Sequence, residues 1–424
     1  MLQLKLIIDN PDFVIQRLKI KNFDATELVE KIIEQYKRKR ELQKEIESLK
    51  AQQNALAREI GKLYKQGRRQ EAEEKKKQST ELKDMIKLLE EKFEPIEKNL
   101  SDLLIQLPNI PHSLVPSGRD SSDNKLIRKG GKVPEFNFEP LSHWDIATKY
   151  DLVDFDLGTK LTGSGFPVYK GQGAILQRAL IRYFLDKAIN EGYIEYIPPF
   201  MVNEETAYGT GQLPDKEGQM YRTMLDNFYL IPTAEVPLTN IYRDVILKES
   251  ELPVKMTAYT PCFRREAGSY GKDVRGLNRV HQFDKVEIVQ IVNPEVSYQV
   301  LEEMVQYVEG LVQSLELPYR IVRLCGGDLS FTSAMTYDFE VFSAGQGRWL
   351  EVSSVSNFET FQSNRMKIRF RSSGQKKNNL VHTLNGSALA LPRIYAAILE
   401  NNQTKEGVRI PNVLVPYTGF DYIK

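Results

Sequence analysis

The first hundred residues carry a hydrophobic pattern whose interval alternates between three and four residues. One run comprises Leu42, Ile46, Leu49, Gln53, Leu56, Ile60 and Leu63, and a second comprises Ser79, Leu82, Ile86, Leu89, Phe93, Ile96 and Leu100. Charged residues fill most of the positions between them, so this is the heptad pattern of a coiled coil. We expect two helices over about residues 27–104, paired as an antiparallel hairpin around a glycine-containing turn. Each helix would extend roughly 50 to 60 Å at 1.5 Å per residue.

The pattern changes after residue 106. The segment LPNIPHSLVPSGRD, residues 107–120, contains three prolines and ends the helical periodicity. Beyond it lie short strand-like runs, aromatic residues and glycine-rich turns, with clear helical patterns at residues 173–193 and 387–403. This order predicts an α+β domain built around an antiparallel sheet with flanking helices. We therefore divide the chain into an N-terminal helical arm (1–106), a linker (107–120) and a second domain (121–424).

The composition excludes several classes of protein. The chain has 41% hydrophobic and 27% charged residues and a net charge of +1, so a polyanion would have to meet a local basic patch. Cys262 and Cys325 are too few for a disulfide framework, and the four histidines show no metal-ligand spacing. No apolar run approaches the roughly twenty residues of a membrane span, and no signal-peptide core follows the N-terminus. We expect a cytoplasmic protein without membrane association.

A basic cluster lies at the predicted tip of the helical hairpin. Its members are Arg58, Lys62, Lys65, Arg68 and Arg69, and only Glu59 opposes them between positions 58 and 69. Taken alone, such a cluster is usually a solvated surface. On a protruding arm that carries further basic runs, it fits an RNA-backbone contact better.

The second unusual segment is PCFRREAGSYGKDVRGLNRVHQF, residues 261–283, which gathers arginines between two strand-like runs. Side chains on a strand alternate between its two faces. This predicts that Arg264 and Glu266 share one face of the first strand. On the second strand, one face would likewise carry Arg279, His281, Phe283, Lys285 and Glu287. Phe283 and Glu287 would lie about 13 Å apart at about 3.3 Å per residue. Such an arrangement suits a triphosphate held by arginines, a base on an aromatic ring and a small polar group read by an acid. The alternative is a surface hairpin whose charges pair internally. Neither a GxxxxGK[ST] loop nor a GxGxxG loop is present, so side chains would have to hold the phosphates.

Several motifs together resemble the seryl-tRNA synthetase family of class II aminoacyl-tRNA synthetases. FRREAG and GLNRVHQFDKVE resemble class II motif 2, and NGSALALPRIYAAILENNQ resembles motif 3. The helix from Gly173 followed by YIPPFMV is similar to motif 1, and GTGQLP, TAEVPLTN and VPYTGFDYI match further family segments. The resemblance runs almost end to end and implies a class II antiparallel sheet preceded by the coiled-coil arm.

The resemblance implies an ATP site. In the family, the position of Arg264 contacts the α-phosphate and the amino acid carboxylate, and the position of Glu266 recognises adenine. The Arg279 and Arg393 positions neutralise the γ-phosphate, and Phe283 stacks on the base. Arg264 and Arg393 are thus the implied catalytic residues.

The resemblance also implies a Mg²⁺ ion that accompanies ATP. Glu351 and Ser354 match its ligands, and a carboxylate with a hydroxyl suits a Mg²⁺ that keeps most of its waters. The implied ATP-binding set is completed by Arg265, Val280, Val352 and Ser353.

A serine pocket is implied as well. Thr233 and Glu235 match the groups that take the α-ammonium, and Glu287 and Ser387 match the pair that reads the hydroxyl. A buried carboxylate that expects a hydroxyl would be left unpaired by alanine, which favours rejection of alanine and glycine. The implied serine-binding set is Thr233, Ala234, Glu235, Arg264, Glu287, Asn385 and Ser387.

The reaction implied by the resemblance has two steps. Serine and ATP would form seryl-adenylate and pyrophosphate, and the seryl group would then pass to the 3′ end of serine tRNA. In the family the enzyme is a homodimer, and the arm contacts the long variable arm of serine tRNA; selenocysteine tRNA is a further substrate where the host has one. Pro392 departs from the family, in which many members carry glycine there.

The residues taken alone admit two alternative functions. One is another ligase that activates a different small acid on the class II scaffold, and the other is a coiled-coil RNA-binding protein with an inactive catalytic domain. The combination of TAE, NGS and the arm speaks against the first, and the complete set of ATP residues speaks against the second.

Overall fold

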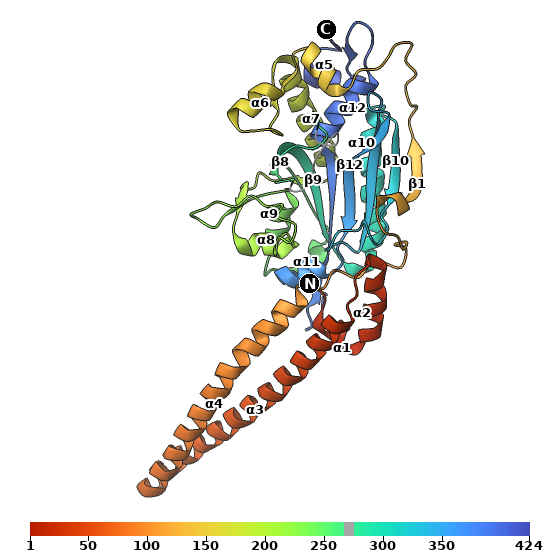
Figure 1. Cartoon of the computed structure of the whole chain (residues 1–424). Helices are drawn as coiled ribbons and strands as arrows, with labels where there is room; N and C mark the ends of the chain where they lie inside the picture. Colours follow the sequence, from red (N-terminus) through yellow and green to blue (C-terminus); the bar gives the residue numbers. More distant parts are fainter. Residues whose placement is uncertain (267–274) are drawn as a thin grey trace. The chain divides into compact units, whose positions relative to one another are not determined.

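The computed structural model describes residues 1–266 and 275–424. Figure 1 shows the chain coloured along its sequence. Its contacts divide the chain into two units, one formed by Met1–Lys19 with Phe23–Pro108 and the other by Ile20–Asn22 with Asn109–Lys424. The side-chain amide of Asn109, at the start of the longer part of the second unit, donates to the carbonyls of Thr332 and Phe358 at 2.9 and 2.8 Å.

The first unit is a helical hairpin. Its helices are α1 (Leu4–Asp9), α2 (Pro11–Leu18), α3 (Thr26–Lys65) and α4 (Arg69–Leu104). Helices α3 and α4 lie side by side (Figure 1), and ion pairs Lys39–Glu97 at 2.6 Å and Lys50–Glu90 at 2.7 Å show that they are antiparallel. From residue 42 to 63 and from 79 to 100, each heptad position is buried or half-buried and each residue between them is exposed. The expected coiled-coil seam is confirmed.

The second unit is built on one large sheet. Among the described residues it has eight strands in the order β1-β10-β11-β12-β15-β9-β8-β4, antiparallel except for the β4–β8 pair. Their bounds are β1 Lys125–Gly130, β10 Tyr319–Arg323, β11 Met335–Ser343, β12 Arg348–Asn357, β15 His382–Ala390, β9 Gln282–Val292, β8 Val254–Phe263 and β4 Ile194–Glu195. The predicted fold class is therefore confirmed.

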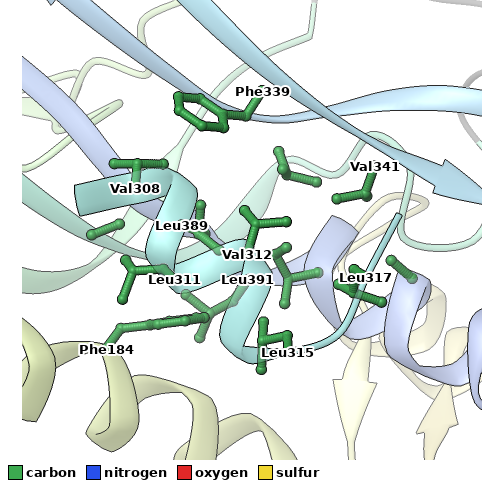
Figure 2. Packing of buried hydrophobic residues seen from close by; sticks show 14 of the residues in the cluster. Phe184, Val308, Leu311, Val312, Leu315, Leu317, Phe339, Val341, Leu389 and Leu391 are labelled. Atoms are coloured by element: carbon green, nitrogen blue, oxygen red, sulfur yellow. The ribbon is translucent and has the colours of Figure 1, made fainter. Parts of the chain in front are cut away.

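Three helices cover one face of this sheet, namely α7 (Gly171–Asn190), α10 (Ser297–Ser314) and α12 (Leu391–Asn401). Figure 2 shows Val308, Leu311 and Val312 of α10 packed among Phe184 of α7 and Phe339 of β11. Alternate residues of the strands point away from this core, so the opposite face is free to carry polar side chains.

Shorter elements complete the unit. The helices are α5 His143–Lys149, α6 Phe155–Leu161, α8 Glu204–Thr210, α9 Glu235–Asn240, α11 Phe361–Met366 and α13 Val415–Thr418. The short strands pair as β2 Val153–Asp154 with β3 Val168–Tyr169, β5 Met201–Val202 with β6 Tyr229–Leu230, β13 Arg369–Arg371 with both β14 Asn379–Leu380 and β7 Ile246–Lys248, and β16 Val408–Arg409 with β17 Tyr422–Ile423. Within the described part of the chain, no helix is long and apolar enough to cross a membrane.

Two local predictions were wrong, and one helix differs only at its ends. The helix expected at residues 387–403 begins at Leu391, because residues 382–390 form β15, and Pro392 lies in the first turn, where a proline needs no N–H partner. The helix expected at 173–193 spans Gly171–Asn190. Strand β9 begins at Gln282, so Arg279 and His281 precede it rather than share its face. His281 instead stacks on Phe166, with ring centroids 5.3 Å apart.

Candidate active site

A cavity of about 570 Å³ opens on the sheet face opposite the helical core. It is lined by β9, β12 and β15, by the first residues of α9 and α12, and by residues that follow β8. The predicted residues that line it are Thr233, Glu235, Arg264, Glu266, Arg279, Val280, Phe283, Glu287, Glu351, Val352, Ser353, Ser354, Asn385, Ser387 and Arg393. The structure thus brings together residues spread over 160 positions of the sequence.

The strand registers explain why these side chains meet. Phe283, Lys285 and Glu287 are alternate residues of β9, and all three line the cavity while Val286 and Ile288 enter the helical core. Residues paired directly across a ladder share a face of the sheet, with Cβ atoms about 5 Å apart. Glu287 pairs with Ser387 of β15 in this way, so the two proposed hydroxyl-reading groups face the same space.

The arginines form one end of the cavity. Arg279 Nη1 lies 3.0 Å from Glu266 Oε2. Arg393, in the first turn of α12, donates from Nε to the Asn278 carbonyl at 2.9 Å and from Nη1 to the Glu351 carbonyl at 2.6 Å. The Arg264 guanidinium lies 5.2 Å from the centre of the Phe283 ring. Carboxylate and carbonyl oxygens therefore keep the guanidinium groups of Arg279 and Arg393 at the cavity, where an anion can bind them.

A buried acidic pocket forms the other end. The Thr233 hydroxyl donates to Glu287 Oε2 at 3.2 Å and accepts from Lys285 Nζ at 2.9 Å. Lys285 also forms an ion pair with Glu287. Gln362 Nε2 donates to Glu235 Oε1 at 2.6 Å. Because all five side chains are nearly inaccessible to solvent, these contacts hold the pocket in a defined polar geometry.

Burial changes the acidity of the two carboxyl groups. Burial, and then the nearby Glu287 charge, raise the pKa of Glu235 to about 7, although Gln362, Lys285 and Arg264 act in the opposite direction. Burial also raises the pKa of Glu287, against the lowering effect of its Lys285 partner. A cationic ligand group placed beside these carboxyls would favour their ionised forms.

The residues predicted to hold Mg²⁺ lie on the cavity side of β12. The Ser354 hydroxyl donates to Glu351 Oε1 at 3.2 Å. Asp338 of β11 pairs with Ser354 across the ladder, and its buried Oδ1 has no hydrogen-bond partner among the described residues. Burial, and then the Glu351 charge, raise the pKa of Asp338 well above its ordinary value. A carboxylate oxygen without a hydrogen-bond partner, beside a second carboxylate, suits a hard divalent cation.

Two predicted residues lie outside the lining. Arg265 contributes its backbone N–H to the Gln219 carbonyl at 2.9 Å. Ala234 is fully buried in the apolar cluster beneath the pocket. The middle of the arginine-rich segment, residues 267–274, lies outside the described residues. Cys262 is fully buried in β8, as expected for a packed strand residue.

Sequence reasoning missed several residues in or next to the cavity. Lys285 was placed on the correct face of its strand but not in the serine pocket, although a lysine two residues from a buried glutamate indicates an ion pair. Gln362, which contacts Glu235, gave no sequence signal because α11 is short. Gln212 and Thr332 also line the cavity, from loops without periodicity.

The basic cluster of the first unit lies at the turn between α3 and α4. Arg58, Lys62, Lys65, Arg68 and Arg69 are all exposed. Arg68 pairs with Glu71 at 2.5 Å, and Glu59 pairs with Lys75 at 3.4 Å. Part of the cluster's charge is thus offset locally.

Comparison with known proteins decides the family. The sequence model of the seryl-tRNA synthetase N-terminal domain matches residues 1–111, and that of the tRNA synthetase class II core domain (G, H, P, S and T) matches residues 220–402. The chain is 48% identical over 421 residues to the serine–tRNA ligase of Salinibacter ruber, covering 99% of this chain and 98% of the relative. This chain belongs to the seryl-tRNA synthetase family.

Solved structures agree with this assignment. The seryl-tRNA synthetase of Pyrococcus horikoshii, crystallised with ATP, has a TM-score of 0.92 and 38% identity to this chain, covering 100% of it and 99% of that structure. A cytoplasmic serine–tRNA ligase of Naegleria fowleri, solved with AMP, has a TM-score of 0.88 and 28% identity, with the same coverage. The prolyl-tRNA synthetase of Giardia lamblia, at 16% identity and a TM-score of 0.55, shares the class II fold alone. The full-length match to serine–tRNA ligases speaks against both alternatives, another small-acid ligase on the class II scaffold and a coiled-coil RNA-binding protein with an inactive catalytic domain.

Proposed function

We propose that the cavity binds ATP and serine together, forms seryl-adenylate, and presents it to serine tRNA, whose 3′ end accepts the seryl group. The chain is a serine–tRNA ligase of the class II type. The proposal on the site is carried by one observation: the arginine end and the buried acidic end belong to the same cavity. An anionic nucleotide and a small zwitterion with a hydroxyl match these two ends.

At the arginine end, Arg279 and Arg393 bind the γ-phosphate, and Arg279 gives up its ion pair with Glu266 to do so. Phe283 provides an apolar face for adenine, and Glu266 accepts from its exocyclic amine. A serine carboxylate oxygen attacks the α-phosphorus, and the bond from that phosphorus to the bridging oxygen breaks to release pyrophosphate. Arg264 neutralises the charge that develops there, so no side-chain nucleophile is required.

Glu351 and Ser354 would hold the Mg²⁺ that comes with ATP, and a cation bound there would favour the ionised form of Asp338 beside them. When bound, the ion neutralises phosphate charge and keeps the phosphates in one geometry. No cluster of three or more acidic, histidine or cysteine side chains suited to a metal occurs among the described residues.

At the acidic end, Glu235 and Thr233 take the α-ammonium of serine. Glu287 and Ser387 read the hydroxyl, and Asn385 lies beside them. Alanine would leave the buried Glu287 oxygen without the hydrogen bond that serine supplies, and the cost of that unpaired group rejects alanine.

The helical hairpin is proposed as the contact with serine tRNA, through the exposed basic residues at its tip. A shape-reading contact with the RNA backbone needs clustered cations rather than base-specific groups. We keep 1–106, 107–120 and 121–424 as the proposed domain limits, and the cytoplasm as the proposed location. Charging of selenocysteine tRNA remains a proposal that depends on the host.

We also propose that the enzyme is a homodimer. Ile194, Ile197 and Met201, at and beyond the edge strand β4, are exposed by 61%, 85% and 51%. Exposed apolar side chains in a run beside an unpaired strand edge are typical of a surface that another subunit covers.

ATP–pyrophosphate exchange with each of the twenty amino acids, without tRNA, tests the proposed chemistry. We expect exchange with serine and essentially none with alanine or glycine. Exchange with a different amino acid would overturn the proposed pocket. Exchange with serine but no charging of serine tRNA would leave the pocket intact and contradict the proposed second step.

A further inference from the structure

A histidine–glutamate pair lies outside the cavity lining, with no solvent exposure of either side chain. His143 is the first residue of α5, and Glu400 lies in the last turns of α12, the helix that begins beside Arg393. His143 Nδ1 and Glu400 Oε1 are 2.7 Å apart. Neither residue was singled out from the sequence, and neither touches the space proposed for substrates.

The surroundings determine which imidazole nitrogen carries the proton. His143 Nε2 accepts from the backbone N–H of Leu277 at 2.8 Å. A backbone N–H can only donate, so Nε2 is unprotonated, and the Nδ1–H donates to Glu400. Glu400 therefore fixes the tautomer that offers Leu277 an acceptor.

Glu400 is itself held firmly. It accepts from the His143 N–H at 2.9 Å, from the Gly345 N–H at 3.1 Å and from the Ser343 hydroxyl. Burial acts to raise the pKa of Glu400, but hydrogen bonds from His143 and Ser343 outweigh it and hold that pKa below its ordinary value. An ionised, multiply bonded carboxylate is a rigid support for the imidazole.

The backbone that His143 holds belongs to residues 275–279, a segment that ends at Arg279 and that we call the limb. At Gly276, where φ is +67°, an added Cβ would lie 2.4 Å from His143 Nε2, so this backbone runs directly against the imidazole. The Arg275 guanidinium lies 4.6 Å from the Trp144 ring centre.

Further contacts link this limb to α12. The side chains of Asn278 and Gln346 exchange two hydrogen bonds, of 2.9 and 3.2 Å. The Asn278 carbonyl accepts from Arg393 Nε at 2.9 Å. The limb from 275 to 279 therefore connects both proposed γ-phosphate arginines, and His143 supports its centre.

We propose that His143, oriented by Glu400, is a positioning residue that sets the geometry of Arg279 and Arg393 for the triphosphate of ATP by holding the Leu277 N–H. The inference rests on the proposed binding of ATP at these arginines. It predicts that loss of the Leu277 contact weakens ATP binding much more than serine binding, because the serine pocket is built from β9, β15 and α9 without this limb.

Two substitutions separate the contacts of the imidazole. His143→Asn places an amide near Nδ1 and keeps the Glu400 contact but does not reach Leu277. His143→Gln reaches toward Nε2 and offers Leu277 an acceptor, while its bond to Glu400 is lost. In serine-dependent ATP–pyrophosphate exchange we expect His143→Asn to raise the KM for ATP about tenfold, because the buried Leu277 N–H would be left without an acceptor. The KM for serine should change less than about twofold. His143→Gln should raise the KM for ATP by a smaller factor.

His382→Asn is the matched control, because His382 is another largely buried imidazole in the same unit, bonded to the Ser297 hydroxyl at 2.7 Å. We expect it to lower the melting temperature while leaving the KM for ATP unchanged. Equal effects of His143→Asn and His143→Gln on the KM for ATP, or a lowered melting temperature with a wild-type KM, would overturn the proposal. If neither variant folds, Gln346→Ala, at a half-buried position, should still raise the KM for ATP; an unchanged KM would be contrary to the inference. Absence of serine-dependent exchange in the unmodified enzyme would instead refute the proposed function.

Discussion

Glu235 is expected to make the capture of serine depend on pH near neutrality. Burial and the Glu287 charge raise its pKa to about 7 in the free enzyme. The α-ammonium of serine binds the ionised carboxylate, so kcat/KM for serine should follow the ionised fraction of Glu235. With a pKa of about 7 that fraction rises from about one tenth at pH 6 to about nine tenths at pH 8, and kcat/KM should rise about tenfold over this interval.

Gln362 provides the perturbation that tests this assignment. Its amide donates to Glu235 at 2.6 Å and stabilises the ionised form. Gln362→Met removes that donor, and the loss of a hydrogen bond to a charged group should raise the pKa of Glu235 by about one unit. The midpoint of the pH profile should then move to higher pH.

The assay is serine-dependent ATP–pyrophosphate exchange from pH 5.5 to 9, at subsaturating serine and saturating ATP. The KM for ATP, measured over the same range at saturating serine, is the internal control. Glu235→Gln should abolish the neutral-pH inflection and lower kcat/KM at every pH. A flat wild-type profile between pH 6 and 8, or an unshifted midpoint in Gln362→Met, would refute the reasoning.

Three further predictions address stability, specificity and the arm. Between pH 4.5 and 7 the folded free enzyme keeps the Glu235 proton, whereas the unfolded chain releases it. Raising the pH through this window should therefore lower the free energy of unfolding of the wild type by about 3 kcal/mol relative to that of Glu235→Gln. Urea unfolding of both proteins at pH 5 and 8 measures this difference. Glu287→Ala should reduce the preference for serine over alanine far more than it raises the KM for ATP; unchanged discrimination in the exchange assay would remove Glu287 from hydroxyl recognition. The Lys39–Glu97 and Lys50–Glu90 ion pairs place residues 46 and 91 opposite each other on α3 and α4. Deletion of residues 46–91 should therefore preserve ATP–pyrophosphate exchange and abolish tRNA charging. Normal charging by the shortened chain would exclude the arm from tRNA recognition.

Much of the local architecture could be predicted from the sequence. The heptad positions from Leu42 to Leu100 identified the seam of the hairpin residue by residue, because a coiled coil is a repeat of local spacing and its partner helix lies nearby in the chain. Nearly all of the residues that the motif resemblance named line the cavity, and period-two alternation correctly placed Phe283 and Glu287 on one face of β9.

The limits of the prediction followed from long-range contacts. The segment 387–390 has helical periodicity but forms strand, because its backbone pairs with β9 near Glu287. Periodicity also placed His281 on the cavity face, whereas the strand starts one residue later and the imidazole packs on Phe166. Neither choice is encoded within the neighbouring residues.

Local sequence thus determined the heptad hairpin, the chemical types of the site residues and the family to which they belong. Only the tertiary structure decided the pairing of Glu287 with Ser387, the contact of Gln362 with Glu235, and the support of Leu277 by His143 and Glu400. These contacts join residues 100 to 257 positions apart. Their pKa values and tautomers depend on burial and on partners from other strands and helices, which exist only when the sheet and its helices have assembled.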